Sequence, residues 1–325
     1  MIDAAIVGLG WWGKNILKAV QGRSDKLRFV HAVSKEIDDA RPLADQHGLK
    51  LSSELDAVLD DARVKAVVLA TPHSLHADQI VRIAAAGKPV FCEKPLALKR
   101  ADAARAVNAC TRAGVILGVG QNKRFWPSME ALRRVVASGV LGRLMHIEGH
   151  YSNENSSQHF SSWRALASET PRAGMTGTGI HILDAFVNLA GPVAEVQTQF
   201  ISTKADPDPR DTIAVLFRFD SGVSGLLGAV RASPFYWRIH VFGDEASAEA
   251  LGETQLVVRQ RGGKTDLRDF PPRDSLRAEF DAFADAVSGR APYPITPAEM
   301  VDTIGAFEAI TRSIETHAPV RVSTL

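Results

Sequence analysis

A glycine-rich segment near the N-terminus is the first part of the chain whose spacing predicts chemistry. It reads Gly8-Leu9-Gly10-Trp11-Trp12-Gly13 and fits the G-x-G-x-x-G pattern. An apolar run precedes it and a helical pattern follows it, which is the context that a dinucleotide-binding loop requires. Gly8 permits a tight turn, Gly10 lets the backbone approach a pyrophosphate, and Gly13 lets the helix pack closely on the strand. We therefore expect a dinucleotide to bind here.

Two tryptophans, Trp11 and Trp12, lie inside this loop. A large aromatic ring at this position can lie against a bound cofactor, and it can equally serve packing or remain at the surface. We assign both residues to the expected cofactor site.

The end of the second predicted strand bears on the choice between NAD and NADP. An acidic residue there accepts hydrogen bonds from the ribose 2′-hydroxyl of NAD. Here the strand 29–33 is followed by Ser34 and Lys35. A hydroxyl and an ammonium suit a 2′-phosphate, so the sequence favours NADP(H) over NAD(H). The alternatives are that Lys35 is only solvated and that Glu36 binds the ribose.

Polar segments also follow two later predicted strands. Thr71-Pro72-His73-Ser74-Leu75-His76 comes after the strand 66–70, and Glu93-Lys94-Pro95 comes after the strand 89–92. Ligands of open α/β sheets bind outside the carboxyl ends of the strands. We expect Pro95 to fix the turn that aims Lys94 toward such a ligand.

The elements that must position these segments change in kind along the chain. Apolar strands separated by helices in residues 1–122 predict a doubly wound parallel sheet, the α/β Rossmann pattern. Residues 123–325 predict an α+β domain with a mostly antiparallel sheet, a polar loop at 153–172 and late helices at 275–287 and 297–316. The expected strands of this second domain are 144–151, 193–203, 212–219, 225–231, 237–243 and 256–259.

Composition excludes several classes of function. The 325 residues carry a formal net charge of +1, and no basic run is interleaved with aromatic residues, so neither nucleic acid nor an anionic membrane is expected as a partner. Neither a leader pattern nor a membrane-spanning run is evident, which predicts a cytoplasmic protein. The only cysteines, Cys92 and Cys110, are expected to be core thiols in a reducing compartment. No metal-ligand spacing links His150, His159 and His240.

The combination of G-x-G-x-x-G, T-P-x-x-x-H and E-K-P resembles the glucose–fructose oxidoreductase/inositol dehydrogenase/rhizopine catabolism family over the whole chain. The resemblance implies an oxidoreductase acting on sugars, polyols or related alcohols, and a homodimer or homotetramer. It implies that Lys94 is the active-site lysine that takes part in proton transfer. It also places the following residues in the cofactor pocket: Thr71, Pro72, His76 and Glu93.

The resemblance further implies a substrate-binding region in the second domain. Asn122 and Arg124 match a family N-x-R stretch, and Trp163 and Arg164 match a W-R element of the polar loop. Either member of the W-R pair could equally anchor the loop. His181 matches a family histidine near the substrate.

This sequence departs from the family where members carry an Asp four residues before that histidine. Gly177 stands at the position, and Asp184, assigned to substrate binding, follows His181 by three residues and does not obviously replace the missing carboxylate. A general base is still available, because an imidazole titrates near neutral pH and a lysine does so where its surroundings favour the neutral amine. We assign the proton transfer jointly to Lys94 and His181.

The leading hypothesis is hydride transfer between NADP(H) and a hydroxyl- or carbonyl-bearing carbon of a sugar, cyclitol or similar alcohol. Reduction of an aldehyde, imine or dihydrodiol is a second hypothesis within the same class. A non-catalytic dinucleotide-binding sensor is an alternative of a different class, which would not need Lys94 and His181 together.

Overall fold

The computed structural model describes residues 1–154, 162–172, 174–205 and 207–325. The chain forms two compact units, of which the first contains residues 1–97, 101–122 and 274–300 and the second contains residues 98–100, 123–273 and 301–325. The chain passes from the first unit to the second after Asn122, and residues 274–300 return to the first unit.

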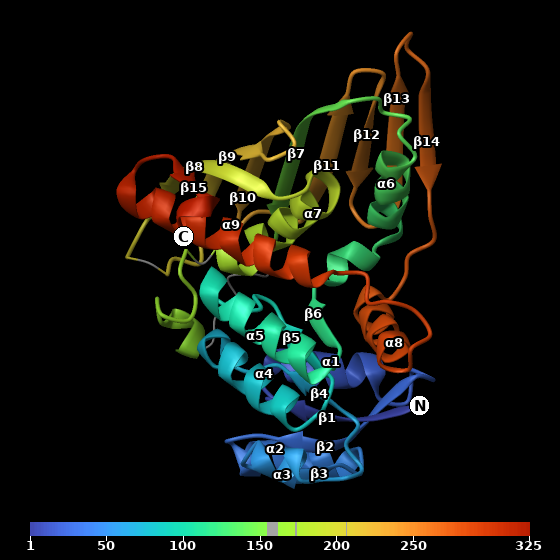
Figure 1. Ribbon diagram of the computed structural model, residues 1–325, viewed down its shortest axis with the longest axis vertical. Coiled ribbons are helices and arrows are strands. Elements are labelled where there is room, and N and C mark those ends of the chain that lie inside the picture. Colours follow the sequence, from blue (N-terminus) through green and yellow to red (C-terminus); the bar gives the residue numbers. More distant parts are fainter. Residues whose placement is uncertain (155–161, 173, 206) are drawn as a thin grey trace. The chain divides into compact units, whose positions relative to one another are not determined.

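The first unit contains a parallel sheet with the strand order β3-β2-β1-β4-β5-β6 (Figure 1). This is the order of a doubly wound dinucleotide-binding fold, and it confirms the expected fold class. The strands are β1 (Ile2–Val7), β2 (Leu27–Val33), β3 (Lys50–Ser52), β4 (Ala66–Leu69), β5 (Val90–Glu93) and β6 (Leu117–Gly120).

Helices cover this sheet and close its core. The helical elements are α1 (Trp11–Val20), α2 (Ile37–Gln46), α3 (Asp56–Leu59), η1 (His73–Leu75), α4 (His76–Ala85), α5 (Arg100–Ala113) and α8 (Ser275–Val287). The short turn η2 (Asn122–Phe125) begins in the first unit and continues in the second. Helix α8 contacts α1 and β2. Its Phe280 and Phe283 pack on Phe91 of β5, with ring centroids 4.4 and 5.6 Å apart. This aromatic contact accounts for the return of the late segment to the Rossmann sheet, since burying such rings is strongly favourable.

The second unit contains a mostly antiparallel sheet with the order β14-β13-β12-β11-β7-β10-β9-β8-β15. Strands β7 and β10 run parallel, and the remaining neighbours in this order run antiparallel. The strands are β7 (Leu144–Ser152), β8 (Val193–Ile201), β9 (Thr212–Phe219), β10 (Ser224–Val230), β11 (Tyr236–Gly243), β12 (Ala246–Leu251), β13 (Gln255–Gln260), β14 (Thr265–Asp269) and β15 (Val320–Arg321).

Helices pack on one face of this sheet. Helix α6 contacts β12 and β13, and α7 contacts β7. Strand β9 alternates buried and exposed residues, as expected for a sheet with one covered face. The helical elements are α6 (Pro127–Ala137), η4 (Ser162–Ala165), η5 (Met175–Gly179), α7 (Ile180–Ala190), α9 (Pro297–Thr316) and η6 (Val322–Thr324).

Some strands had no clear sequence signal. Three of the six residues of β12 are Ala, and three of the five residues of β14 are charged. β-Branched and aromatic residues, which favour strands, are absent from β12 and are represented in β14 by Thr265 alone. Their neighbours in the sheet supply the hydrogen bonds that hold them. Two glycines near helix and strand ends adopt the left-handed region, namely Gly139 after α6 at φ 75° and Gly222 between the antiparallel strands β9 and β10 at φ 83°.

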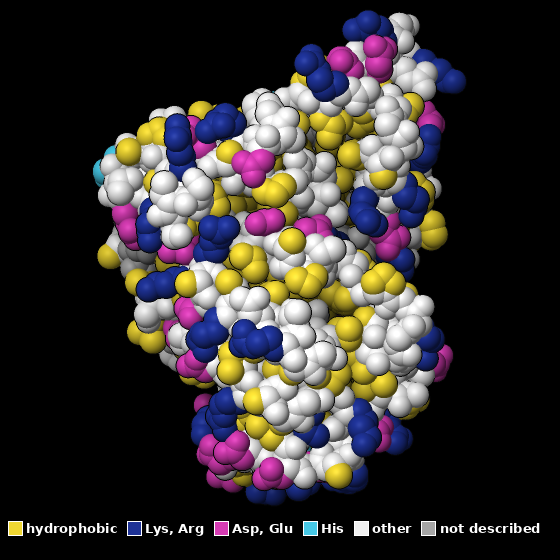
Figure 2. Space-filling model, in the orientation of Figure 1, with side chains coloured by type: hydrophobic (Ala, Val, Ile, Leu, Met, Phe, Trp, Pro, Cys, Tyr) yellow, Lys and Arg dark blue, Asp and Glu magenta, His cyan; other side chains and the backbone are white. Residues whose placement is uncertain are grey.

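Charged side chains of both signs are interspersed over the visible face of the molecule (Figure 2). Among the described residues, no helix is both long enough and apolar enough to cross a bilayer.

Candidate functional site

The glycine-rich loop connects β1 to α1 at the point where the strand order reverses. Gly8 has φ 97°, and a Cβ there would lie 2.5 Å from the carbonyl oxygen of Ala70, just after β4. A Cβ on Gly13 would collide with the carbonyl oxygen of Gly8. Any larger residue at either position would separate the helix from the strand ends, so both glycines are required for the turn.

Gly10 has a different role in the same loop. It is the residue before α1, it has an ordinary φ of −67°, and a Cβ there would meet nothing within 4 Å. The backbone conformation and the packing at position 10 therefore do not require a glycine. The open space above the N-terminus of a ten-residue helix fits the close approach of a pyrophosphate, which these backbone N–H groups can bind. The residues present thus fit a dinucleotide.

The two loop tryptophans differ in exposure. Trp11 is 48% exposed, and its ring centroid lies 5.3 Å from that of the half-buried Trp12. Trp11 thus offers an aromatic surface beside Gly10, whereas Trp12 takes part in packing.

The residues expected to select the cofactor lie at the end of β2. Ser34 is buried, and its hydroxyl lies 3.4 Å from both the backbone oxygen and the carboxylate of Glu36. The exposed ammonium of Lys35 forms an ion pair of 2.8 Å with Glu54. An exposed pair of this kind is weak, so a 2′-phosphate can compete for Lys35.

His76 links the two polar segments that follow β4 and β5. It is fully buried, with Nδ1 2.8 Å from the carbonyl oxygen of Pro95 and Nε2 3.0 Å from that of Thr71. Sequence analysis assigned His76 to the cofactor pocket. In the structure these two contacts are with backbone, and they hold the Glu-Lys-Pro segment against the end of β4. The hydroxyl of Thr71 donates to Gln79 at 2.6 Å, and Pro72 precedes η1.

The Glu-Lys-Pro segment itself is tightly packed. The Lys94–Pro95 bond is cis, Glu93 is buried, and the Lys94 backbone N–H donates to the Glu93 carboxylate at 3.3 Å. Gly120 pairs with Glu93 across β5 and β6, and a Cβ on Gly120 would lie 2.7 Å from Glu93 Oε1. Gly120 was not among the expected site residues; its signal was the second glycine of Leu117-Gly118-Val119-Gly120, in a strand where glycine is disfavoured.

Both cysteines are buried and free, as predicted. Burial raises the pKa of the Cys92 thiol well above its usual value and that of Cys110 to about 11. Neither residue is therefore a thiolate nucleophile at neutral pH.

His181, which the family resemblance places near the substrate, lies in the second unit. It is 7% exposed in the first turn of α7, directly after the π-helical turn η5. The ring of Tyr151 on β7 lies 6.2 Å from the His181 ring, and the Lys123 ammonium lies 5.7 Å from the Tyr151 ring. Burial raises the pKa of Tyr151. Tyr151 and Lys123 were missed because only the folded chain brings Tyr151 near His181 and Lys123 near Tyr151.

Arg124 and Asp184, both assigned to the substrate, bind each other. Arg124 Nε donates to Asp184 Oδ2 at 2.7 Å, and Nη2 donates to Oδ1 at 2.8 Å. Both side chains are almost fully buried. This bidentate pair fixes α7, and therefore His181, to the segment after β6. Asn122, by contrast, is in the first unit, where its amide lies 3.4 Å from the Ser275 hydroxyl.

Gly177, at the position of the family's Asp, lies next to an arginine. A Cβ on Gly177 would lie 3.7 Å from both Cζ and Nη2 of Arg231, which follows β10 and is 4% exposed. Burial lowers the pKa of Arg231 to about 10, so the guanidinium remains charged at neutral pH. No local pattern links Arg231 to Gly177, because Arg231 lies 54 residues further along the chain and approaches η5 only in the folded protein.

The W-R element lies in η4. The guanidinium carbon of Arg164 stacks 4.3 Å from the Trp163 ring centre, and neither residue is fully buried. Residues 155–161 of this polar loop, which include His159, lie outside the described residues. Within the described parts of the chain, no group of three or more His, Cys, Asp or Glu side chains could hold a metal ion.

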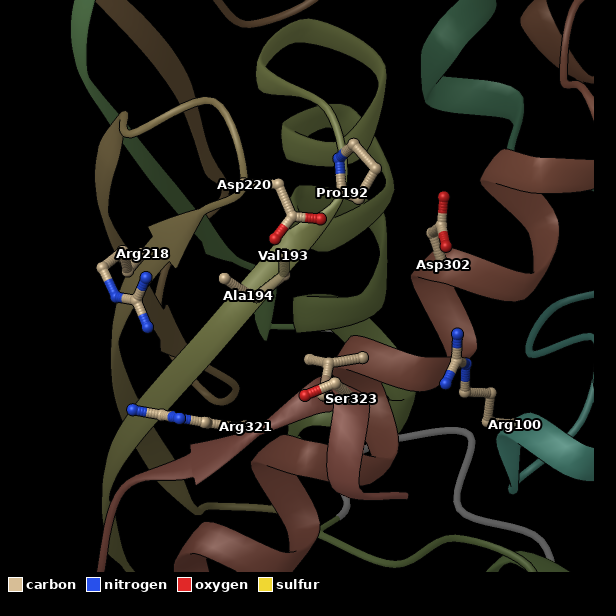
Figure 3. A pocket seen from close by; sticks show the side chains of 10 residues that line it. Arg100, Pro192, Val193, Ala194, Arg218, Asp220, Asp302, Arg321 and Ser323 are labelled. Carbon is tan, nitrogen blue, oxygen red and sulfur yellow. The ribbon is translucent and has the colours of Figure 1, made fainter.

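A separate pocket of about 380 Å³ lies in the second unit and contains none of the predicted site residues (Figure 3). Charged side chains from several elements surround it, and Arg218 and Arg321 both pair with Glu195. The lining residues with ionisable side chains are Arg100, Arg218, Asp220, Asp302 and Arg321.

Comparison with protein families covers both units. The family described as "Oxidoreductase family, NAD-binding Rossmann fold" matches residues 2–121. The "GFO/IDH/MocA C-terminal domain" matches residues 129–249.

Individual proteins extend this similarity over the full length. The rhizopine catabolism protein MocA of Rhizobium meliloti is 28% identical, over 94% of this chain and 93% of its own. Two other relatives, each 28% identical, are matched over only 53% and 64% of their own length.

Two crystal structures share the fold. One is from Desulfitobacterium hafniense and is described as an NADPH-dependent oxidoreductase; it has a TM-score of 0.88 and 23% identity, over 99% of this chain and 98% of its own. The other, levoglucosan dehydrogenase with NADH and L-sorbose, has a TM-score of 0.87 and 20% identity, over 99% and 98%. Together with the two family matches, these findings show that the chain belongs to the glucose–fructose oxidoreductase/inositol dehydrogenase/MocA family of oxidoreductases.

Proposed function

We propose that this protein transfers a hydride between NADP(H) and a carbon bearing a hydroxyl or carbonyl group on a sugar, cyclitol or related small alcohol. One observation carries most weight: His76 ties the Lys94-bearing segment to the end of β4, beside the glycine loop. Since β1, β4 and β5 are adjacent and parallel, the ends of these strands lie at one edge of the sheet. A lysine there is well placed to serve a ligand bound by the glycine loop.

Side chains of the protein would accept or donate the proton of the substrate hydroxyl. The bound nicotinamide supplies or accepts the hydride, and the substrate hydroxyl loses or gains a proton in the same reaction. We assign that proton jointly to the Lys94 ammonium and the His181 imidazole. Glu93, held next to the Lys94 backbone, fixes the turn that carries the lysine.

The preference for NADP(H) over NAD(H) is part of this proposal. It is supported by Ser34 in place of a carboxylate at the end of β2 and by the exposed ammonium of Lys35. A structural relative described as NADPH-dependent agrees with it, while levoglucosan dehydrogenase was crystallised with NADH. Fluorescence titration should show that NADPH binds more tightly than NADH. Lys35→Ala should weaken the binding of NADPH and leave the binding of NADH unchanged. Equal affinity for both cofactors would contradict the assignment.

The decisive test of activity uses Lys94. Purified full-length protein is incubated with NADP⁺ or NADPH and a panel of sugars, cyclitols, aldehydes and dihydrodiols, and absorbance of the reduced cofactor is followed. We expect turnover with at least one hydroxylated substrate. In Lys94→Ala, turnover should fall at least about 100-fold, as expected when a general acid–base is removed. The variant should still bind NADPH. Undiminished turnover in this variant would remove Lys94 from the mechanism. Cofactor binding without any turnover would instead favour a sensor.

We also propose that the chain is a homodimer or homotetramer that acts in the cytoplasm. The sheet of the second unit exposes apolar side chains on the face opposite α6 and α7, among them the paired residues Leu216 and Leu226. Such a face suits self-association. Two buried free thiols suit a reducing compartment. Light scattering measures the oligomeric state, and Leu216→Lys should shift the protein toward monomer.

A further inference from the structure

We propose that Glu54 is a further residue that sets cofactor specificity: its carboxylate holds the ammonium of Lys35 and so weakens the preference for NADP(H) over NAD(H). This role rests on the proposed function, in which Lys35 binds the 2′-phosphate of the cofactor, and it concerns the same site. It starts from the ion pair between the two side chains, just past the ends of β2 and β3.

The register of the sheet places Glu54 next to Lys35. Strands β2 and β3 are parallel, and Val33 pairs with Ser52 at the ends of the two strands. Lys35 and Glu54 each follow this pair by two residues. The Ser34 N–H donates to the Ser52 carbonyl oxygen at 3.0 Å, which holds the two strand ends together. The backbone positions from which the two side chains meet are therefore fixed by strand pairing.

A buried side chain also anchors this end of β3. The ring of His31 on β2 is fully buried, and its Nε2 lies 3.0 Å from the Ser52 hydroxyl oxygen. Strand β3 is the edge strand of the parallel sheet, so β2 is the neighbour that positions it. Glu54 thus follows a strand end that both backbone and side chain hold against β2.

The ion pair itself lies in solvent. Lys35 Nζ is 2.8 Å from Glu54 Oε1, and the two side chains are 72% and 66% exposed. Among the described residues, neither side chain forms another ion pair. An exposed pair of this kind contributes little to stability. The fold therefore does not depend on Glu54, and its carboxylate acts mainly on the charge available at Lys35.

The carboxylate and a 2′-phosphate compete for the same ammonium. A phosphate monoester carries about −1.5 to −2 charges at pH 7, so it is repelled by a carboxylate that shares its cation. The 2′-hydroxyl of NAD(H) is uncharged and experiences no such repulsion. Glu54 should therefore weaken the binding of NADPH and leave that of NADH nearly unaffected.

The test compares Glu54→Gln with the matched control Asp45→Asn. Glu54→Gln keeps the size of the side chain and removes its charge. Asp45→Asn makes the same change in net charge within the same unit, but Asp45 lies in the last turn of α2, about 12 Å along the helix from its first residue. Salt screens a charge at that separation. Isothermal titration of the full-length proteins with NADPH and with NADH gives the ratio of the two affinities.

We expect Glu54→Gln to bind NADPH about three- to tenfold more tightly than the unaltered protein does. Its affinity for NADH should stay within about twofold, and Asp45→Asn should change either affinity by less than about twofold. The Tm should change little in both variants, because both side chains are exposed. An unchanged ratio of affinities in Glu54→Gln, or an equal gain in Asp45→Asn, would overturn the role of Glu54.

A double variant tests whether Glu54 acts through Lys35. In a Lys35→Ala background no ammonium is left to compete for, so Glu54→Gln should improve NADPH binding much less than it does in the unaltered protein. A gain of the same size in both backgrounds would contradict this mechanism. The affinity of Glu54→Gln for NADPH should also fall more steeply with added salt, since the ammonium then meets the phosphate without a neighbouring carboxylate.

These measurements need no turnover. If both cofactors bind as expected and no substrate of the panel is converted, the proposed hydride transfer fails and the role of Glu54 stands. If a substrate is converted and Glu54→Gln leaves the ratio of affinities unchanged, only the role of Glu54 fails. If neither cofactor binds, both proposals fail.

Discussion

Arg124 and Asp184 form a buried bidentate ion pair that joins the segment after β6 to helix α7. Asp184 follows His181 by three residues, so the pair sets the orientation of the helix that presents the imidazole. A carboxylate that the sequence suggested for the substrate is therefore engaged by a residue of its own chain.

Removing one partner of this pair should destabilise the protein. Asp184→Asn leaves the Arg124 guanidinium buried without its counter-charge, and breaking such pairs costs about 3–5 kcal/mol. Urea denaturation of the free protein measures the loss. The double variant Arg124→Met with Asp184→Leu, which removes both charges, should recover much of it. A loss below about 1 kcal/mol in Asp184→Asn would mean that the pair contributes little to stability.

Gly10 should be needed for the cofactor and not for the fold. Gly10→Val adds a side chain where nothing lies within 4 Å, at an ordinary φ, so the Tm should change little. The same side chain should block the approach of a pyrophosphate and weaken NADPH binding by at least about tenfold. Isothermal titration measures the affinity. Gly8→Val is the contrasting variant, because its side chain would collide with Ala70 and should lower the Tm as well.

His76 should act as a positioning residue for Lys94. In His76→Phe, the carbonyl oxygen that accepts the ring N–H, on Thr71 or on Pro95, loses that donor in a buried place, at a cost of about 1–3 kcal/mol. We expect kcat to fall more than KM rises, since the segment that bears Lys94 is loosened. His76→Gln retains a donor and should recover part of kcat. If His76→Gln and His76→Phe lower kcat equally while the Tm is unchanged, positioning through these hydrogen bonds is contradicted.

His240 should make the stability of the protein depend on pH. Burial is the main cause that lowers its pKa to about 4, although the neighbouring Glu249 opposes the shift and Arg238 and Arg259 add to it. Because an unfolded histidine titrates near 6.5, the unfolded state binds more protons between about pH 4 and 6.5. The contribution of His240 is therefore complete above about pH 6.5 and is lost as the pH falls toward 4.

The pKa of Glu249 is also lowered, mainly by hydrogen bonds from Arg238 and Arg259 that outweigh its burial, so its contribution is lost in the same direction below about pH 4.5. Denaturation at a series of pH values should show a decline of about 1–3 kcal/mol from pH 7 to 4.5 that His240→Gln reduces. The same slope in both proteins would exclude His240 as its source.

The sequence by itself determined the nucleotide-binding half of this protein. The apolar strands, the glycine pattern and the polar strand ends are local signals, and Gly8, Gly13 and the Glu-Lys-Pro segment occupy the positions that those signals require. These features depend on neighbours in the chain, because backbone conformation and short-range packing decide them.

Only the tertiary structure decided the surroundings of the second-unit residues. Nothing in the sequence linked Arg231 to Gly177 or Tyr151 to His181, because each pair is brought together by strands of a sheet whose register depends on distant residues. The partners of Arg124 and His76 were likewise set by packing, since a charge or ring buried in the core takes whichever acceptor the fold provides. Long-range packing thus set the partners of these side chains, which their residue types alone did not specify.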